Sequence, residues 1–110
     1  MTRMHRLLLA ISLLGVCLAQ DYRAKIQGAV SDPVGAALAG ARVVLRNVGT
    51  AGEIVRVSGA DGRYVFDFVE SGTYSIAVEA PGFKRFEQRA FTVQNRGDIT
   101  IDARLELGAV

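Results

Sequence analysis

The sequence predicts an all-β fold, a seven-stranded antiparallel Greek-key β-sandwich that is preceded by a signal-peptide helix at residues 1–19. Three observations lead to this fold class. Apolar and polar residues alternate through most of residues 23–107, as expected of strands with one buried face. Turn signals interrupt the alternation about every 8–12 residues, which is typical of a sandwich. Fully buried parallel strands would be apolar on both faces, so the alternation favours antiparallel pairing.

The first 19 residues form a candidate signal peptide. A basic start at residues 3–6 precedes the apolar run Leu7–Leu18, which is shorter than the roughly 20 residues that a membrane span needs. We expect cleavage after Ala19, which supplies the small residue that signal peptidase reads. The alternative is a lipoprotein signal in which Cys17 carries the lipid. Cleavage after Ala19 predicts a soluble product, whereas lipidation of Cys17 predicts a membrane-anchored product.

Cleavage would change the composition of the remaining domain, residues 20–110. The single His and the single Cys would be lost, and the 11 remaining basic residues would balance 11 acidic ones. A neutral domain is not indicated as a partner of nucleic acid. The mature domain also contains no apolar run long enough to span a membrane.

Seven segments of the mature domain show strand alternation. We expect strands at residues 23–31, 41–47, 53–58, 63–68, 74–80, 83–93 and 99–107. Asp32–Gly35 fits a type I turn, and Asp61-Gly62 suits a hairpin because both residues tolerate a left-handed backbone. A change of parity within residues 83–93 predicts a β-bulge near Arg89-Ala90.

The inward positions of these strands define the predicted core. In the third strand we expect Val55 and Val57 to point inward and Arg56 to point outward. The predicted core residues are Ile26, Val30, Val43, Leu45, Val57, Tyr64, Phe66, Tyr74, Ile76, Val78, Phe83, Ile99, Ile101 and Leu105.

Five short motifs occur in a familiar order. They are Ile26-x-Gly28-x-Val30-x-Asp32, Gly40-Ala41-x-Val43-x-Leu45, Asp61-Gly62-x-Tyr64-x-Phe66, Gly72-x-Tyr74-x-Ile76-x-Val78 and Gly82-Phe83. Together they resemble the carboxypeptidase regulatory-like domain, which has a transthyretin-like sandwich fold, over about residues 24–107. The resemblance implies an accessory, non-catalytic domain of the kind attached to metallocarboxypeptidases and to the N-termini of Oar-like TonB-dependent receptors.

The resemblance also implies a location and a partner. We expect secretion across the inner membrane of a Gram-negative bacterium and a place in the periplasm or at the outer membrane. The protein would be an accessory domain of a TonB-dependent receptor, or a piece truncated from one. Its partner would be a periplasmic or outer-membrane protein, and Lys84, Arg85 and Arg89, on a predicted outward face, are the candidate docking residues.

The mature domain lacks the residue types on which most catalytic and metal sites depend. Nucleophilic catalysis needs a base beside the nucleophile, and no His or Cys follows residue 19. The usual zinc ligands are absent for the same reason, and the aspartates do not form a dense calcium loop. We therefore expect no enzymatic activity, no cofactor and no metal.

An internal isopeptide bond is a further possibility, because the Cna B-type sandwiches of surface adhesins form one with the help of a buried acid. That acid is the Glu of a Tyr-x-Leu-x-Glu pattern. Here the matching run begins at Tyr74, Val78 takes the place of the acid, and Glu79 comes one residue late. Since a slip of one residue reverses the face, we expect Glu79 to be exposed and the bond to be absent.

Carbohydrate binding is the alternative function, since sandwiches of this type stack exposed aromatic rings on sugars. Tyr22 lies outside the strand pattern and is one candidate. Phe68 is the other, but period two places it in the core with Tyr64 and Phe66. If Val69 turns inward instead, Phe68 is exposed and available for stacking.

Overall fold

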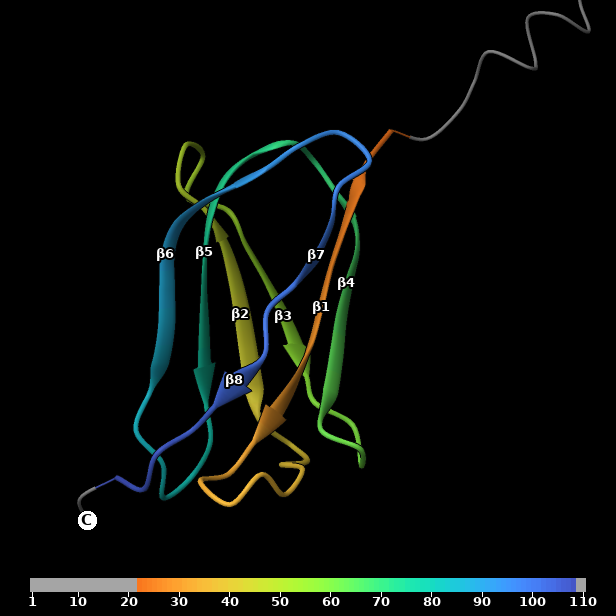
Figure 1. The fold of residues 1–110 in the computed structure, drawn as a ribbon. Coiled ribbons are helices and arrows are strands. Elements are labelled where there is room, and N and C mark those ends of the chain that lie inside the picture. Colours follow the sequence, from red (N-terminus) through yellow and green to blue (C-terminus); the bar gives the residue numbers. More distant parts are fainter. Residues whose placement is uncertain (1–21, 109–110) are drawn as a thin grey trace, which may run out of the picture.

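The computed structural model describes residues 22–108, which form two four-stranded β-sheets packed face to face (Figure 1). The strands are β1 Ala24–Ser31, β2 Arg42–Asn47, β3 Glu53–Val57, β4 Arg63–Val69, β5 Gly72–Glu79, β6 Phe86–Val93, β7 Asp98–Thr100 and β8 Ala103–Arg104. One sheet has the order β4-β1-β7, with β8 also paired to β1, and the other has the order β3-β2-β5-β6. The predicted all-β sandwich is confirmed. The predicted signal peptide, including Cys17 and Ala19, lies outside the described residues.

The last predicted strand consists of two short strands, so the described part of the chain has eight strands in place of seven. Both β7 and β8 pair with β1 in parallel, with Val30 opposite Ala103 in the β8 pair. The prediction of a wholly antiparallel fold is therefore wrong for these two pairs, whereas β1–β4, β2–β3, β2–β5 and β5–β6 are antiparallel. The final segment is interrupted where the Asp102 side chain accepts a hydrogen bond from the Ala29 N–H at 3.0 Å, in place of a backbone carbonyl.

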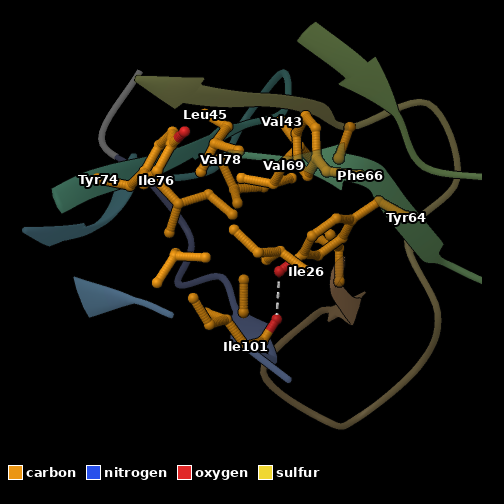
Figure 2. Close-up of a cluster of buried hydrophobic side chains, with 14 of the residues drawn as sticks. Ile26, Val43, Leu45, Tyr64, Phe66, Val69, Tyr74, Ile76, Val78 and Ile101 are labelled. Carbon is orange, nitrogen blue, oxygen red and sulfur yellow. Dashed lines mark hydrogen bonds between the residues drawn. The ribbon is translucent and has the colours of Figure 1, made fainter. Parts of the chain in front are cut away.

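The core between the sheets follows the predicted alternation closely. Its largest fully buried side chains are Phe66, Ile26, Leu45, Ile76, Leu105, Val30, Val43, Val69, Val78 and Val93. The side chains of both sheets meet in one cluster (Figure 2). Phe83 and Ile99, also predicted to be core residues, are partly buried and pack against this cluster.

The side chains of β3 face the opposite way from the prediction. Arg56 lies opposite buried Val43 in the β2–β3 ladder, and its guanidinium carbon is 5.6 Å from the centroid of the Phe66 ring. Val57, a predicted core residue, lies on the outer face and is 64% exposed, and Val55 is 40% exposed. Apolar residues occur at both parities of this edge strand, so alternation alone does not determine its orientation.

The predicted bulge in β6 is confirmed. Tyr74 lies opposite Phe91 but Ile76 lies opposite Gln88, so β6 holds one extra residue between the two pairs. Ala90 sits at this point with a left-handed φ of 53°. The bulge explains why the apolar residues of this strand do not keep one parity.

The two predicted turns form, but one of them has a different role. The Gly35 N–H donates to the Asp32 carbonyl at 3.0 Å, as in the expected type I turn. The Gly62 N–H donates to the Gly59 carbonyl at 2.9 Å, and Gly62 has a left-handed φ of 77°. This second turn joins β3 to β4, which belong to different sheets, so the predicted hairpin is wrong.

Candidate functional site

Phe68 lies at a β-bulge near the end of β4. Ala24 is paired with Val69 and Ile26 with Phe66, so β4 holds one more residue than β1 in this interval. The backbone of Phe68 is left-handed, with φ of 58°, and 64% of the residue is exposed, whereas Val69 is buried. The prediction from strand alternation that Phe68 lies in the core is therefore wrong. The alternative, in which Val69 turns inward and Phe68 is exposed, is confirmed.

The Phe68 ring contacts one cation, and the neighbouring strands of the β4-β1-β7 sheet carry further polar residues. The Arg23 guanidinium carbon lies 4.8 Å from the ring centroid, which is a cation–π distance. Lys25 lies opposite the bulge and is paired in register with Asp98 of β7. The Gln27 side-chain amide donates to the Asp98 carboxylate at 3.3 Å. The face thus combines one exposed ring with hydrogen-bond donors and acceptors, and sequence patterns did not reveal the Gln27–Asp98 pair.

Tyr22 precedes β1 at the same end of this sheet. It is 51% exposed, and its carbonyl accepts a hydrogen bond from the Arg96 N–H at 2.7 Å. Because Ala24 pairs with Val69, Tyr22 and Phe68 belong to the same end of the β1–β4 pair. The ring contacts found among residues 22–108 do not include a contact between these two rings.

The three candidate docking residues lie around β6 and are exposed. Lys84 Nζ lies 3.9 Å from Glu106, Arg85 Nε lies 3.5 Å from Glu79, and Arg89 Nε donates to Glu87 at 2.7 Å. The Arg89 hydrogen bond lowers the pKa of the Glu87 carboxyl. Each cation is thus matched locally by a carboxylate, and the docking role of these residues stays a prediction.

Tyr64 is a buried titratable residue that belongs to the core. Its hydroxyl donates to the Ile101 carbonyl (Figure 2), and burial, together with the nearby Asp102 charge, raises its pKa above the ordinary value. A Cβ on Gly28 would lie 1.8 Å from the Ile101 oxygen and 2.8 Å from the Tyr64 hydroxyl. Gly28 is therefore required by this close approach, and an isolated glycine inside a strand was the signal for it.

Residues 22–108 contain no cluster of three or more His, Cys, Asp or Glu side chains able to hold a metal ion. Two of the aspartates act in local structure instead, since Asp61 accepts from the Arg63 N–H at 3.0 Å and Asp102 from the Ala29 N–H. The buried Ser58 hydroxyl donates to the Leu38 carbonyl at 2.7 Å. Within the same residues, no helix has the length and apolar character of a membrane span.

The residues that an isopeptide bond would require are placed as their parity predicts. Val78 is fully buried, and Glu79 faces outward, where it pairs with Arg85. Lys25 belongs to the half-buried outer positions of β1. The structure therefore brings no acid to the position occupied by Val78.

The comparisons with known proteins identify one family. The carboxypeptidase regulatory-like domain matches residues 25–106, nearly all of the described chain. No curated protein matches the sequence. The family match agrees with the order of motifs in the sequence and with the observed sandwich.

Several solved structures share the fold. A proposed carbohydrate-binding protein from Bacteroides uniformis aligns with a TM-score of 0.61 and 26% identity, over 76% of this chain and 41% of its own. BcpA, the major pilin subunit of Bacillus cereus, aligns at 0.64 and 17% identity, over 76% of this chain and 28% of its own. A dioxygenase domain from Streptomyces sp. SirexAA-E aligns with a TM-score of 0.58 and 13% identity, over 83% of this chain and 84% of its own. The chain thus spans less than half the length of the first two, and the last two show the fold alone.

Proposed function

The chain belongs to the carboxypeptidase regulatory-like domain family, and we propose that it is a non-catalytic module that binds carbohydrate on the outer face of the β4-β1-β7 sheet. The observation that carries this proposal is the exposed Phe68 ring on a left-handed backbone. The similarity to a proposed carbohydrate-binding protein supports the class of ligand.

Phe68 combines backbone strain with poor burial. A left-handed φ is a genuine outlier for a bulky residue and costs about 1–3 kcal/mol, which glycine or asparagine would largely avoid. The bulge itself serves folding, because it turns Val69 into the core. It does not explain why a phenylalanine occupies it, since 64% of that residue remains exposed. A ligand that covers the ring would supply the missing reason.

The polar groups of this sheet suit a sugar. An aromatic face stacks on the apolar C–H face of a pyranose, while neighbouring polar groups bond its hydroxyls. Gln27 and Asp98 together offer an amide and a carboxylate, and Lys25 adds a cationic donor. We propose that these three residues fix the orientation of the sugar and that Tyr22 extends the aromatic surface.

The test is titration of the purified protein with a panel of neutral and acidic oligosaccharides, followed by NMR and calorimetry. We expect binding that shifts the signals of Phe68 and Gln27 and that falls at least about tenfold in Phe68→Gly. Because glycine accepts a left-handed φ, the variant relieves the backbone strain at this position. This gain is expected to offset the small loss of ring contact, so that the variant folds as stably as the wild type. A loss of binding is then separated from a loss of folding.

Two results would contradict the proposal. One is that no oligosaccharide in the panel shifts these signals. The other is that Phe68→Gly binds as tightly as wild type. Tyr22→Ala serves as a matched comparison, since it removes an exposed ring outside the strands, and its effect is expected to be smaller than that of Phe68→Gly.

We propose further that the module works outside the inner membrane, in the periplasm or at the outer membrane, as an accessory domain of a TonB-dependent receptor. The signal-like residues 1–19 and the resemblance of the motifs support this location. Cell fractionation and a pull-down from the envelope test it. The intact mass of the mature protein distinguishes cleavage after Ala19 from lipidation of Cys17.

A further inference from the structure

Strand β3 has a free edge. Within residues 22–108 it pairs with β2 and with no other strand. The Ser58 N–H donates to the Ala41 carbonyl and the Asn47 N–H to the Gly52 carbonyl, both at 2.9 Å. Even-numbered positions of this segment therefore direct their backbone groups toward β2, and odd-numbered positions, such as Val55, direct theirs away from the sheet.

Two other outer strands, β6 and β4, are less suited to accept a partner. β6 carries the bulge at Ala90 and the Arg89–Glu87 ion pair, and β4 carries the bulge at Phe68. Bulges and charges are common means of protecting a sheet edge. β3 has a regular register with β2 and exposes apolar side chains on both faces, namely Ile54 at 39%, Val55 at 40% and Val57 at 64%.

Arg56 occupies the open edge. Its Nη1 donates to the carbonyl of Val55 at 2.9 Å, and its guanidinium lies over the Phe66 ring. The Arg56 side chain thus bonds the Val55 carbonyl, which is the acceptor that the backbone N–H of an incoming strand would use. Among the described residues Arg56 has no carboxylate partner, and neither do Arg42 and Arg46 on the adjacent β2. Strands β2 and β3 together carry these three arginines and one acid, Glu53, which lies opposite Arg46, so the charge near this edge is net positive and favours an acidic partner.

We propose that β3 binds an extended segment of another protein by strand addition, and that this segment alternates apolar and acidic residues. Directly opposed residues of neighbouring strands share a face. Apolar side chains of the partner would therefore pack beside Val55 and Val57, while an acidic side chain would lie beside Arg56 on the other face. Arg56 exchanges its bond to the Val55 carbonyl for an ion pair, and the partner's backbone N–H takes its place.

The test uses capped synthetic peptides and the full-length protein. One peptide alternates valine and glutamate, and its control alternates valine and lysine. We expect NMR shifts along β3, slower amide exchange at Val55 and Val57, and affinity for the glutamate peptide at least about tenfold above that for the lysine peptide. Arg56→Glu is expected to reverse this preference, and Arg56→Gln, which keeps a donor, to weaken it.

A matched charge reversal on the opposite edge, Arg89→Glu, is expected to leave the peptide preference unchanged. Equal binding of the two peptides, shifts that follow β6 or β4 instead of β3, or no binding at about 1 mM peptide would overturn the proposal. Protection of Val55 and Val57 that appears without peptide and grows with protein concentration would assign the edge to a second copy of the chain, and would also overturn it. Phe68→Gly leaves this binding intact, so the outcome is independent of the proposed sugar site.

Discussion

The hydroxyl of Tyr64 joins β4 to the C-terminal segment of the described chain through a single hydrogen bond. Its hydroxyl donates to the carbonyl of Ile101, and Gly28 makes room for both groups. The sequence identified Tyr64 as a core residue, but alternation carries no information about where a buried hydroxyl finds its acceptor. The glycine in the middle of β1 was the one visible signal, since a strand interior otherwise favours a larger residue.

The raised pKa of Tyr64 makes stability depend on alkaline pH. Its folded-state pKa lies above the ordinary value of about 10, so this contribution is complete below pH 10 and is lost as the unfolded chain ionises above it. We expect the free energy of unfolding of wild type to fall above about pH 10 by up to about 1.4 kcal/mol per pH unit more than that of Tyr64→Phe.

Urea denaturation of both proteins between pH 7 and pH 11 measures this difference. At pH 7 the variant is expected to be about 1–3 kcal/mol less stable, because the buried Ile101 carbonyl loses its donor. Identical alkaline slopes for the two proteins would show that Tyr64 ionises as readily when folded as when unfolded.

At the scale of the element, β3 shows where alternation stops being informative. Strands with one clear apolar parity, such as β1 and β5, were placed on the correct face by the sequence. In β3 the apolar residues occur at both parities, and the pairing with β2 decided the face. The bulge at Ala90 was predictable because it breaks a visible parity. The bulge at Phe68 was only one of two alternatives, because a phenylalanine suits either outcome.

Because the side chains of β3 face the opposite way from the prediction, replacing valine by threonine is expected to have unequal effects on the two faces of the β2–β3 pair. Val57→Thr places a hydroxyl in water and is expected to change the free energy of unfolding by no more than about 0.5 kcal/mol. Val43→Thr places the same hydroxyl in the core and is expected to cost about 1–3 kcal/mol. Chemical denaturation measures both values, and a larger loss for Val57→Thr would mean that β3 faces the other way.

At the scale of the whole molecule, the sequence predicted the class of fold and most of the core but not the way in which the chain closes. The first and last strands pair in parallel, which requires groups about 70 residues apart to meet, as in the bond from Leu105 N–H to the Ser31 carbonyl. Local alternation does not encode such long-range pairing. The surface proposed to bind sugars likewise combines residues that are distant in the sequence, since Gln27 and Asp98 meet only in the folded sheet.

The two sheets share one core, so a deletion in either is expected to weaken the whole domain. Phe66 is the largest fully buried side chain, and Phe66→Ala is expected to cost about 3–5 kcal/mol, a large part of the stability of a small domain. Calorimetry and denaturation are expected to show a single transition at lower temperature and lower denaturant concentration. A loss below about 1 kcal/mol would mean that the Phe66 side chain is not packed in the core. A second transition would mean that the sheets unfold separately.

The parallel pairing of β1 with β7 and β8 also has a mechanical consequence. The described chain enters the sandwich at one end and leaves it at the other (Figure 1). A pull on the two ends therefore slides β1 along its neighbours, and the bonds from Lys25, Ile101 and Leu105 N–H groups to Gly97, Gln27 and Ser31 carry the load together. A hairpin pulled from its open end would lose such bonds one at a time. We expect the domain to resist stretching as a stiff link, able to transmit tension between whatever its two ends are joined to.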